Sequence, residues 1–259
     1  MTEDYLTRVR SYYNETADLY LEALGPFCQA GLIEGFDPDP YRSTMMHIKD
    51  RANIRKGSRI LDAGSGLCGP CIHLCQMIPD LSVEAITVSE EQASRARRLV
   101  EDSGFANGIH VTVGDYHQMP FPDESFDVVL FLESTGYSYD PPRLFREVRR
   151  VLRHSGTAYI KDVFCFDGAL SMDEMAELAT VDKTFVQTTR PMTFYVGELI
   201  SAGFNEVRQA PLPTASTDAW AAAMWHMENG SLALTAFGKR HYRPFRNLPL
   251  VFGEIVAKN

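Results

Sequence analysis

Three glycines, a serine and an aspartate between positions 62 and 69 are the residues of this sequence best suited to hold a ligand. A short apolar run ends at Asp62, and the small residues follow at Gly64, Ser65, Gly66 and Gly69. This order predicts a strand, a glycine turn and a helix. In such a turn the backbone passes close to a ligand, and the start of the helix offers free N–H groups. The spacing therefore indicates a nucleotide-like binding site.

The elements that would position this turn form a regular alternation of strands and helices. Apolar runs predict strands at 59–62, 83–88, 109–113, 127–132 and 157–164, separated by helices at 70–77, 90–102 and 142–152. Ser89 and Gln92 form a capping box that opens the helix at 90–102. Two later strands are predicted at 204–210 and 250–257. We therefore predict an α/β fold with a doubly wound, Rossmann-like, mostly parallel seven-stranded sheet and an antiparallel C-terminal edge.

The other segments are predicted to be largely helical and to cover the sheet. Helices are expected at 1–24, 41–54, 172–180, 194–202 and 218–228. We expect residues 1–55 to form a helical N-terminal lid and residues 56–166 to form the ligand-binding core. Residues 167–259 would complete the sheet and carry a substrate-cap insertion.

Composition and charge exclude several classes of function. The chain has 259 residues, 45% of them hydrophobic, and a net charge of −9. This charge argues against nucleic acid as the main partner, because phosphate binding needs a basic surface. No apolar run is long enough to span a bilayer, and the charged N-terminus lacks the apolar core of a signal peptide. We expect a cytoplasmic protein that acts on a small molecule without a membrane partner.

The five cysteines are expected to be reduced, because their number is odd and no secretion signal precedes them. Cys68, Cys71 and Cys75 have the spacing of a metal cluster at first sight. On a helix, however, Cys71 and Cys75 share one face, which normally packs on a sheet. We therefore predict that these thiols lie in the core, and we predict no metal site.

The predicted sheet brings polar residues together beyond the carboxyl ends of its strands, where such folds bind ligands. A nicotinamide cofactor would need an acidic residue after the second strand for its ribose, and Thr87 stands there. A dehydrogenase is therefore disfavoured.

The segments LDAGSG, AITVSEEQ, GDYHQMPFPDESFDVVLFLES and FREVRRVLRHSGTAYIKD resemble, in this order, the class I S-adenosylmethionine-dependent methyltransferases. The resemblance covers roughly residues 58–165 and implies S-adenosylmethionine as the cofactor. It implies that Asp115 accepts from the adenine amino group and that Thr87 replaces the usual acidic ribose ligand. The chain departs from the family at Cys68, where a third glycine is common, and at Ser155, where proline is usual. The implied cofactor contacts are Asp62, Gly64, Ser65, Gly66, Thr87, Ser89, Gln92, Gly114, Asp115, Tyr116 and Tyr20.

The segment YYNETADLY resembles the N-terminal lid of the small-molecule members of this family. Its tyrosines would contact the cofactor or roof the substrate, and the sequence does not show which one does so. A basic cluster at 239–243 is a candidate binder of a diphosphate or carboxylate. The residues expected to contact the substrate are Tyr12, Tyr13, Tyr137, Trp225, Arg240 and Arg243.

Glu133 follows the apolar strand at 127–132 and is the expected catalytic residue. A carboxylate there is costly to bury unless it is paired or takes part in the reaction. The stretch from Glu133 to Thr135, with Tyr137, resembles the prenyl diphosphate C-methyltransferases. That resemblance implies C-methylation of an alkene-bearing, prenyl diphosphate-like substrate, with the glutamate stabilising a cation and removing a proton.

Two other functions stay open. One is O- or N-methylation of a secondary metabolite, assisted by Glu133 or a histidine such as His117. The other is a cyclase or binding protein that kept the methyltransferase fold. The sequence does not determine the oligomeric state, for which a homodimer is one candidate.

Overall fold

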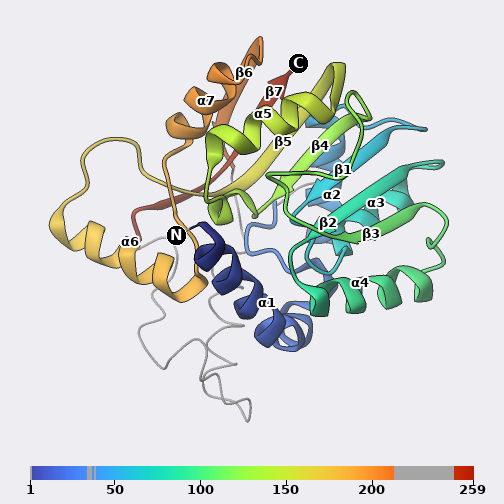
Figure 1. Cartoon of the computed structure of the whole chain (residues 1–259), viewed down its shortest axis with the longest axis horizontal. Helices are drawn as coiled ribbons and strands as arrows, with labels where there is room; N and C mark the ends of the chain where they lie inside the picture. Colours follow the sequence, from blue (N-terminus) through green and yellow to red (C-terminus); the bar gives the residue numbers. More distant parts are fainter. Residues whose placement is uncertain (1, 34–36, 38, 213–247) are drawn as a thin grey trace.

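The computed structural model describes residues 2–33, 37, 39–212 and 248–259. Figure 1 shows a central twisted sheet with helices on both faces. Its strands are β1 (Arg59–Ala63), β2 (Ser82–Thr87), β3 (Ile109–Val113), β4 (Phe126–Leu132), β5 (Leu152–Cys165), β6 (Glu206–Pro211) and β7 (Leu250–Lys258). The longer helices are α1 (Thr2–Leu24), α2 (Pro40–Arg51), α3 (Gly69–Met77), α4 (Glu90–Asp102), α5 (Pro141–Val151), α6 (Met172–Phe185) and α7 (Met192–Ser201). Two short 3-10 turns lie at Gly25–Phe27 and Thr135–Tyr137.

The sheet has the predicted seven strands, in the order β3-β2-β1-β4-β5-β7-β6. Strands β1 to β5 pair in parallel, whereas β7 runs antiparallel to both β5 and β6. The doubly wound fold with antiparallel pairing at its C-terminal edge is therefore confirmed. The sequence left open the position of β7, which enters between β5 and β6.

Side-chain alternation along the strands divides the core into two layers. In β4, Val128, Leu130 and Leu132 pack on the side of α2, α3 and α4. Val129 and Phe131 point to the opposite side, where they meet α5 and α7. Because successive side chains alternate between two covered faces, the uninterrupted apolar run at 128–132, within the strand predicted at 127–132, indicates a central strand.

Most predicted elements are confirmed within a few residues. The helix at 90–102 has its predicted bounds, and Ser89 caps its start by accepting a hydrogen bond from Gln92 N. The helix predicted at 172–180 is longer and extends to Phe185. Strand β5 begins at Leu152 instead of residue 157, and its pairing with β4 shifts register between Phe126 and Val128. The helix expected at 218–228 lies outside the described residues.

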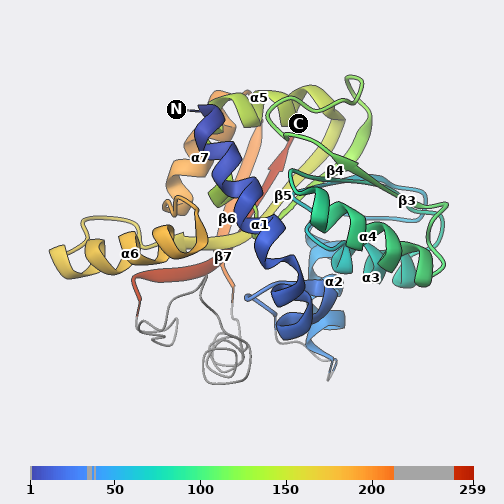
Figure 2. The ribbon, with the colours of Figure 1, turned by 60° about the horizontal axis from the view of Figure 1, so that its bottom comes forward.

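Helix α1 crosses the carboxyl-terminal side of the sheet, between α6 and α4 (Figures 1 and 2). Near its start, the Tyr5 hydroxyl donates to Val186 O. Nearer its end, Asp18 forms an ion pair with Arg95 of α4. This position fits the predicted lid, while the division of the chain at residues 55 and 166 stays a prediction.

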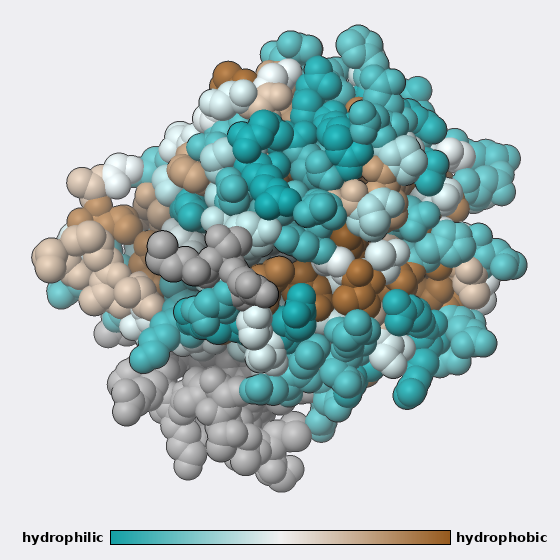
Figure 3. Space-filling view, in the orientation of Figure 1, coloured by the Kyte–Doolittle hydropathy of each residue, from teal (hydrophilic) through white to brown (hydrophobic). Residues whose placement is uncertain are grey.

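Helix α6 projects from the body of the molecule and carries apolar surface, seen at the left of Figure 3. Met172 and Met175 are exposed there, and no residue of α6 is fully buried. Among the described residues, no helix has both the length and the apolar composition that a bilayer crossing needs.

Candidate active site

A cavity of about 880 Å³, including its solvent-open mouth, lies beyond the carboxyl ends of β1 to β4. Helix α1 covers it with Leu6, Val9, Tyr13 and Tyr20. The fold thus brings together residues that are up to about 130 positions apart in the chain. The predicted site residues that line it are Asp62, Gly64, Ser65, Gly66, Thr87, Gln92, Gly114, Asp115, Tyr116, Glu133, Tyr137, Tyr13 and Tyr20.

The glycine turn is held against the second strand by its own backbone. The N–H groups of Gly64 and Ser65 both donate to Ile86 O, at 2.9 and 3.0 Å. Gly64 has φ +87°, and a Cβ added to it would lie 2.5 Å from Ser134 Cβ. Only glycine satisfies both constraints. Cys68, which stands where the family usually has glycine, also has a left-handed φ of +61°.

Asp62 and Ser65, which line this cavity, each carry a buried polar atom without a partner among the described residues. Asp62 is buried, and one of its oxygens, Oδ2, accepts from the Cys71 thiol at 3.0 Å. The other oxygen and the Ser65 hydroxyl have no hydrogen-bond partner among the described residues. Burial raises the pKa of Asp62 to about 6. Buried polar atoms without a partner are costly, so their clustering in one cavity indicates a polar ligand.

The cysteines of this region belong to the core. Cys68 and Cys71 are buried in the cluster beneath α3, and Cys75 packs against it. Within the described part of the chain, no group of three or more His, Cys, Asp or Glu side chains is arranged to hold a metal ion.

The residues at and just after the end of β2 have different roles. The Thr87 hydroxyl donates to Gln92 Oε1 at 2.8 Å, and both residues line the cavity. Ser89 does not line it, contrary to the expected cofactor contact. Its hydroxyl instead accepts from Gln92 N, which caps α4, and donates to Asn14 Oδ1 of α1 at 2.7 Å. Ser89 therefore joins the lid to the sheet.

Asp115 is fixed by an aromatic pair. One oxygen accepts from the backbone N–H of His117 and pairs with its ring Nδ1, and the other accepts from the Tyr139 hydroxyl at 2.5 Å. The two rings stack with centroids 3.7 Å apart. Burial acts to raise the pKa of Asp115, but hydrogen bonds from His117 and Tyr139 outweigh it and lower the pKa.

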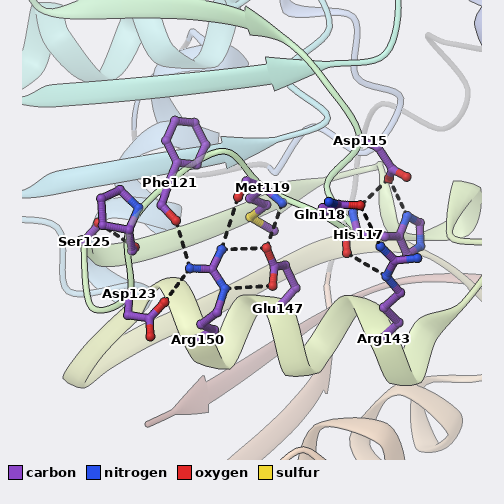
Figure 4. A network of polar contacts seen from close by, with 11 residues as sticks. Asp115, His117, Gln118, Met119, Phe121, Asp123, Ser125, Arg143, Glu147 and Arg150 are labelled. Carbon is purple, nitrogen blue, oxygen red and sulfur yellow. Dashed lines mark hydrogen bonds and ion pairs between the residues drawn. The ribbon is translucent and has the colours of Figure 1, made fainter.

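The loop that carries Asp115 is held rigidly on α5. Figure 4 shows Arg143 reaching His117 O and Gln118, and Arg150 reaching Glu147 and Asp123. These contacts orient the loop independently of any ligand.

A second cavity of about 560 Å³ adjoins the first. Both are lined by Tyr13, Tyr20, Cys28, Glu133 and Tyr137, so these residues form the junction. The second cavity is otherwise mostly apolar, and no arginine or lysine among the described residues lines either one. The residues found only in the second cavity are Ala30, Asp162, Val163, Val181, Phe185, Gln187 and Phe252.

The lid tyrosines are distributed around this junction. Tyr13 packs edge-on against Tyr137, with ring centroids 5.2 Å apart. Tyr12 lies behind them and lines neither cavity, contrary to the expected substrate contact. Its hydroxyl lies 2.7 Å from that of Tyr20, so Tyr12 supports the wall rather than forming it. Trp225, Arg240 and Arg243 lie outside the described residues.

Glu133 lies at the junction but is extensively bonded. Its backbone has φ +60°, and its carboxylate pairs with Lys161, whose side chain is fully buried. The same carboxylate accepts from Ala30 N at 2.8 Å and Gly31 N at 3.0 Å. Glu133 therefore holds a fixed negative charge beside the cavity and joins the chain at residues 30–31 to the sheet.

Asp162 is, with Glu133, one of the two carboxylates that line the second cavity. One oxygen, Oδ2, accepts from Thr135 N and the Thr135 hydroxyl, at 2.9 and 2.6 Å, and the other accepts from Val163 N. No ion pair to Asp162 is formed by the described residues. Burial raises its pKa to about 6.

Sequence reasoning missed Gln29, Lys161 and Asp162. For the last two, a signal was present, because a lysine and an aspartate stand side by side within the apolar strand at 157–164. Charged residues in a buried strand are paired or functional. For Gln29, in the loop after α1, no local signal exists.

Comparisons with known proteins agree with this architecture. Residues 61–160 match the family model described as a methyltransferase domain, which confirms the resemblance predicted for the core. The sterol 24-C-methyltransferase erg6 of Aspergillus fumigatus is 32% identical over 159 residues, which are 59% of this chain and 41% of that protein. The chain thus spans about two fifths of the length of this relative.

Two solved structures share the fold over nearly the whole chain. The [4+2]-cyclase SpnF is 18% identical, with a TM-score of 0.80 over 97% of this chain and 94% of that one. Geranyl diphosphate C-methyltransferase from Streptomyces coelicolor A3(2) was solved with Mg²⁺, geranyl diphosphate and S-adenosyl-L-homocysteine. It is 17% identical, with a TM-score of 0.73 over 98% of this chain and 97% of that one. At these identities the similarity establishes the fold.

Proposed function

We propose that this chain is an S-adenosylmethionine-dependent methyltransferase that methylates carbon of an alkene-bearing small molecule. The observation that carries the proposal is the pair of adjoining cavities. One is lined by the glycine turn, Thr87 and Asp115, and the other by aromatic rings and two carboxylates. The two meet at Glu133, where a methyl donor in the first cavity would face an acceptor in the second.

The residues of the first cavity fit the proposed cofactor. The glycine at position 64 lets Ser134 pack directly against the turn, and Asp62 and Ser65 carry polar atoms without a partner among the described residues. Thr87 and Gln92 would face the ribose, and Asp115 the adenine. When bound, the cofactor would supply an electrophilic methyl group on a sulfonium.

The second cavity suits an acceptor that becomes positively charged during the reaction. An alkene that forms a new bond to a methyl group is left with a carbocation, which an anionic or aromatic wall stabilises. Glu133 supplies the fixed charge, and Tyr13, Tyr20 and Tyr137 supply ring faces and edges at the junction. Asp162, with a pKa nearer neutrality and no ion-pair partner in the described chain, would then accept the proton.

A candidate partner for the polar end of the substrate comes from the sequence. A prenyl diphosphate-like substrate would place its apolar chain among Val163, Val181, Phe185 and Phe252. Its diphosphate would need the basic cluster that contains Arg240 and Arg243, since neither cavity wall offers a cation among the described residues.

A second candidate is O- or N-methylation, because the same Asp162 could deprotonate a hydroxyl or an amine. The experiment that separates the functions incubates the full chain with methyl-labelled S-adenosylmethionine. The acceptors are geranyl diphosphate, a sterol with a side-chain double bond, a phenol and a secondary amine. Label in a new carbon–carbon bond supports the proposal, whereas label on oxygen or nitrogen supports the second candidate. A rearranged product without label would identify a cyclase.

Replacing Asp115 with alanine is expected to weaken cofactor binding by about 1–3 kcal/mol, the cost of losing a hydrogen bond to a charged group. The loss should be equal for S-adenosylhomocysteine and methylthioadenosine, because both contain adenine. Isothermal titration calorimetry with the two ligands tests this. Unchanged dissociation constants would show that adenine binds elsewhere.

A further inference from the structure

Three residues that line the first cavity each carry a buried oxygen atom with no hydrogen-bond partner among the described residues. The atoms are Asp62 Oδ1, Ser65 Oγ and Gln29 Oε1. All three side chains are more than nine-tenths buried. The first two belong to the glycine turn, whereas Gln29 comes from the segment that follows the lid helix. The Ser65 hydroxyl can donate or accept, but the oxygens of Asp62 and Gln29 call for a ligand that donates.

The chain around Gln29 is held in place on both sides. On one side, Phe27 packs in the core against Tyr41, with ring centroids 4.7 Å apart. Just before Phe27, the backbone of Pro26 passes close to Gly69. A Cβ added to Gly69 would lie 2.3 Å from Pro26 O. This approach ties the segment to the start of α3, next to the glycine turn.

On the other side, the Glu133 carboxylate binds the N–H groups of Ala30 and Gly31. Gly31 also lies against Phe252, whose ring carbon would be 2.4 Å from an added Cβ. The segment ends at Ile33, whose N–H donates to the Thr44 hydroxyl at 2.8 Å. The position of Gln29 is therefore determined by contacts with the sheet and α2, not by its own loop.

We propose that Gln29 binds the amino group of the amino-acid part of the cofactor, together with Asp62. This inference rests on the proposed function. An ammonium group has three donors and no acceptor, so it matches an amide oxygen and a carboxylate oxygen of two residues that line one cavity. Glu133 then positions Gln29 through Ala30 and Gly31, and the lid segment becomes part of the cofactor site.

The test compares S-adenosylhomocysteine with its analogue that lacks the α-amino group, by calorimetry on the full chain. Replacing Gln29 with leucine keeps the size of the side chain and removes its oxygen. We expect the affinity for S-adenosylhomocysteine to fall about 10- to 100-fold, since hydrogen bonds to charged groups are the strong ones. The affinity for the deaminated analogue should change less than about twofold.

Gln29→Glu provides a second measurement if the leucine variant does not fold. Its carboxylate should bind S-adenosylhomocysteine at least as tightly as the parent chain and discriminate more strongly against the deaminated analogue. Equal losses for both ligands in Gln29→Leu, or no loss for either, would overturn the assignment while the proposed cofactor stands. If the parent chain binds neither ligand, the proposed function and this inference both fail.

Discussion

Replacing Asp162 with asparagine is expected to lower the turnover number about 100-fold or more, the typical cost of losing a general base. The substitution keeps the shape of the side chain and an oxygen that can accept from Thr135. It removes the charge that would take a proton from the methylated substrate. Steady-state kinetics at saturating cofactor and acceptor, with calorimetry for cofactor affinity, measures the effect.

Asp182 provides a matched control. Its carboxylate accepts from Thr189 N and the Thr189 hydroxyl at 2.9 and 2.6 Å, as Asp162 does from Thr135, but it lines neither cavity. Asp182→Asn should therefore leave turnover nearly unchanged. Equal losses in the two variants would show that Asp162 serves only to hold its threonine.

The pH dependence of turnover follows from the raised pKa of Asp162. The base works only when ionised, so turnover should fall as the pH drops below about 6. Neighbouring titratable groups interact with this carboxyl. The Glu133 carboxylate contributes to the raised pKa of Asp162, and Asp162 in turn contributes to the raised pKa values of Tyr116, Tyr137 and Tyr195. The acidic limb should disappear from the residual activity of Asp162→Asn. If the fall in turnover at low pH persists in this variant, it arises from another titrating group.

Replacing Glu133 with glutamine is expected to destabilise the folded chain by about 3–5 kcal/mol. The Lys161 side chain is fully buried, so the substitution leaves an ammonium without a counter-charge. The glutamine NH₂ group would also face an N–H donor at Ala30 or Gly31. Urea unfolding followed by circular dichroism measures the loss.

The double variant Glu133→Gln/Lys161→Met separates structure from chemistry. Removing both charges should restore most of the stability, because no buried charge is then left without a partner. If Glu133 also stabilises a cation, turnover should stay about 100-fold low in the double variant. Recovery of both stability and turnover would assign Glu133 a purely structural role and end the preference for carbon methylation.

Local rules in the sequence determined the alternating core of this protein. Strand alternation, the glycine turn and the cap at Ser89 depend on residues no more than about four positions apart. For this reason the helix at 90–102 and the strand at 109–113 were predicted with their observed bounds. The order of motifs along the chain also sufficed to indicate the methyltransferase-domain match at residues 61–160 and most of the residues that line the first cavity.

Only the tertiary structure decided what the carboxylates of the site contact. Glu133 and the backbone at 30–31 are about 100 residues apart, and they meet because the lid segment crosses the end of β4. The sequence therefore predicted Glu133 as the catalytic residue but did not identify its partner. The fold pairs it with Lys161 and places Asp162 in the wall of the second cavity.

The placement of Gln29 has the same origin. No periodicity or capping pattern marks it, because its position depends on close approaches at Gly31 and Gly69 to distant segments. Spacing along a chain determines which residues share a face of one element. Strand order and the packing of segments far apart in the sequence determine which elements meet. They also determine which polar atoms are left unpaired where the elements meet.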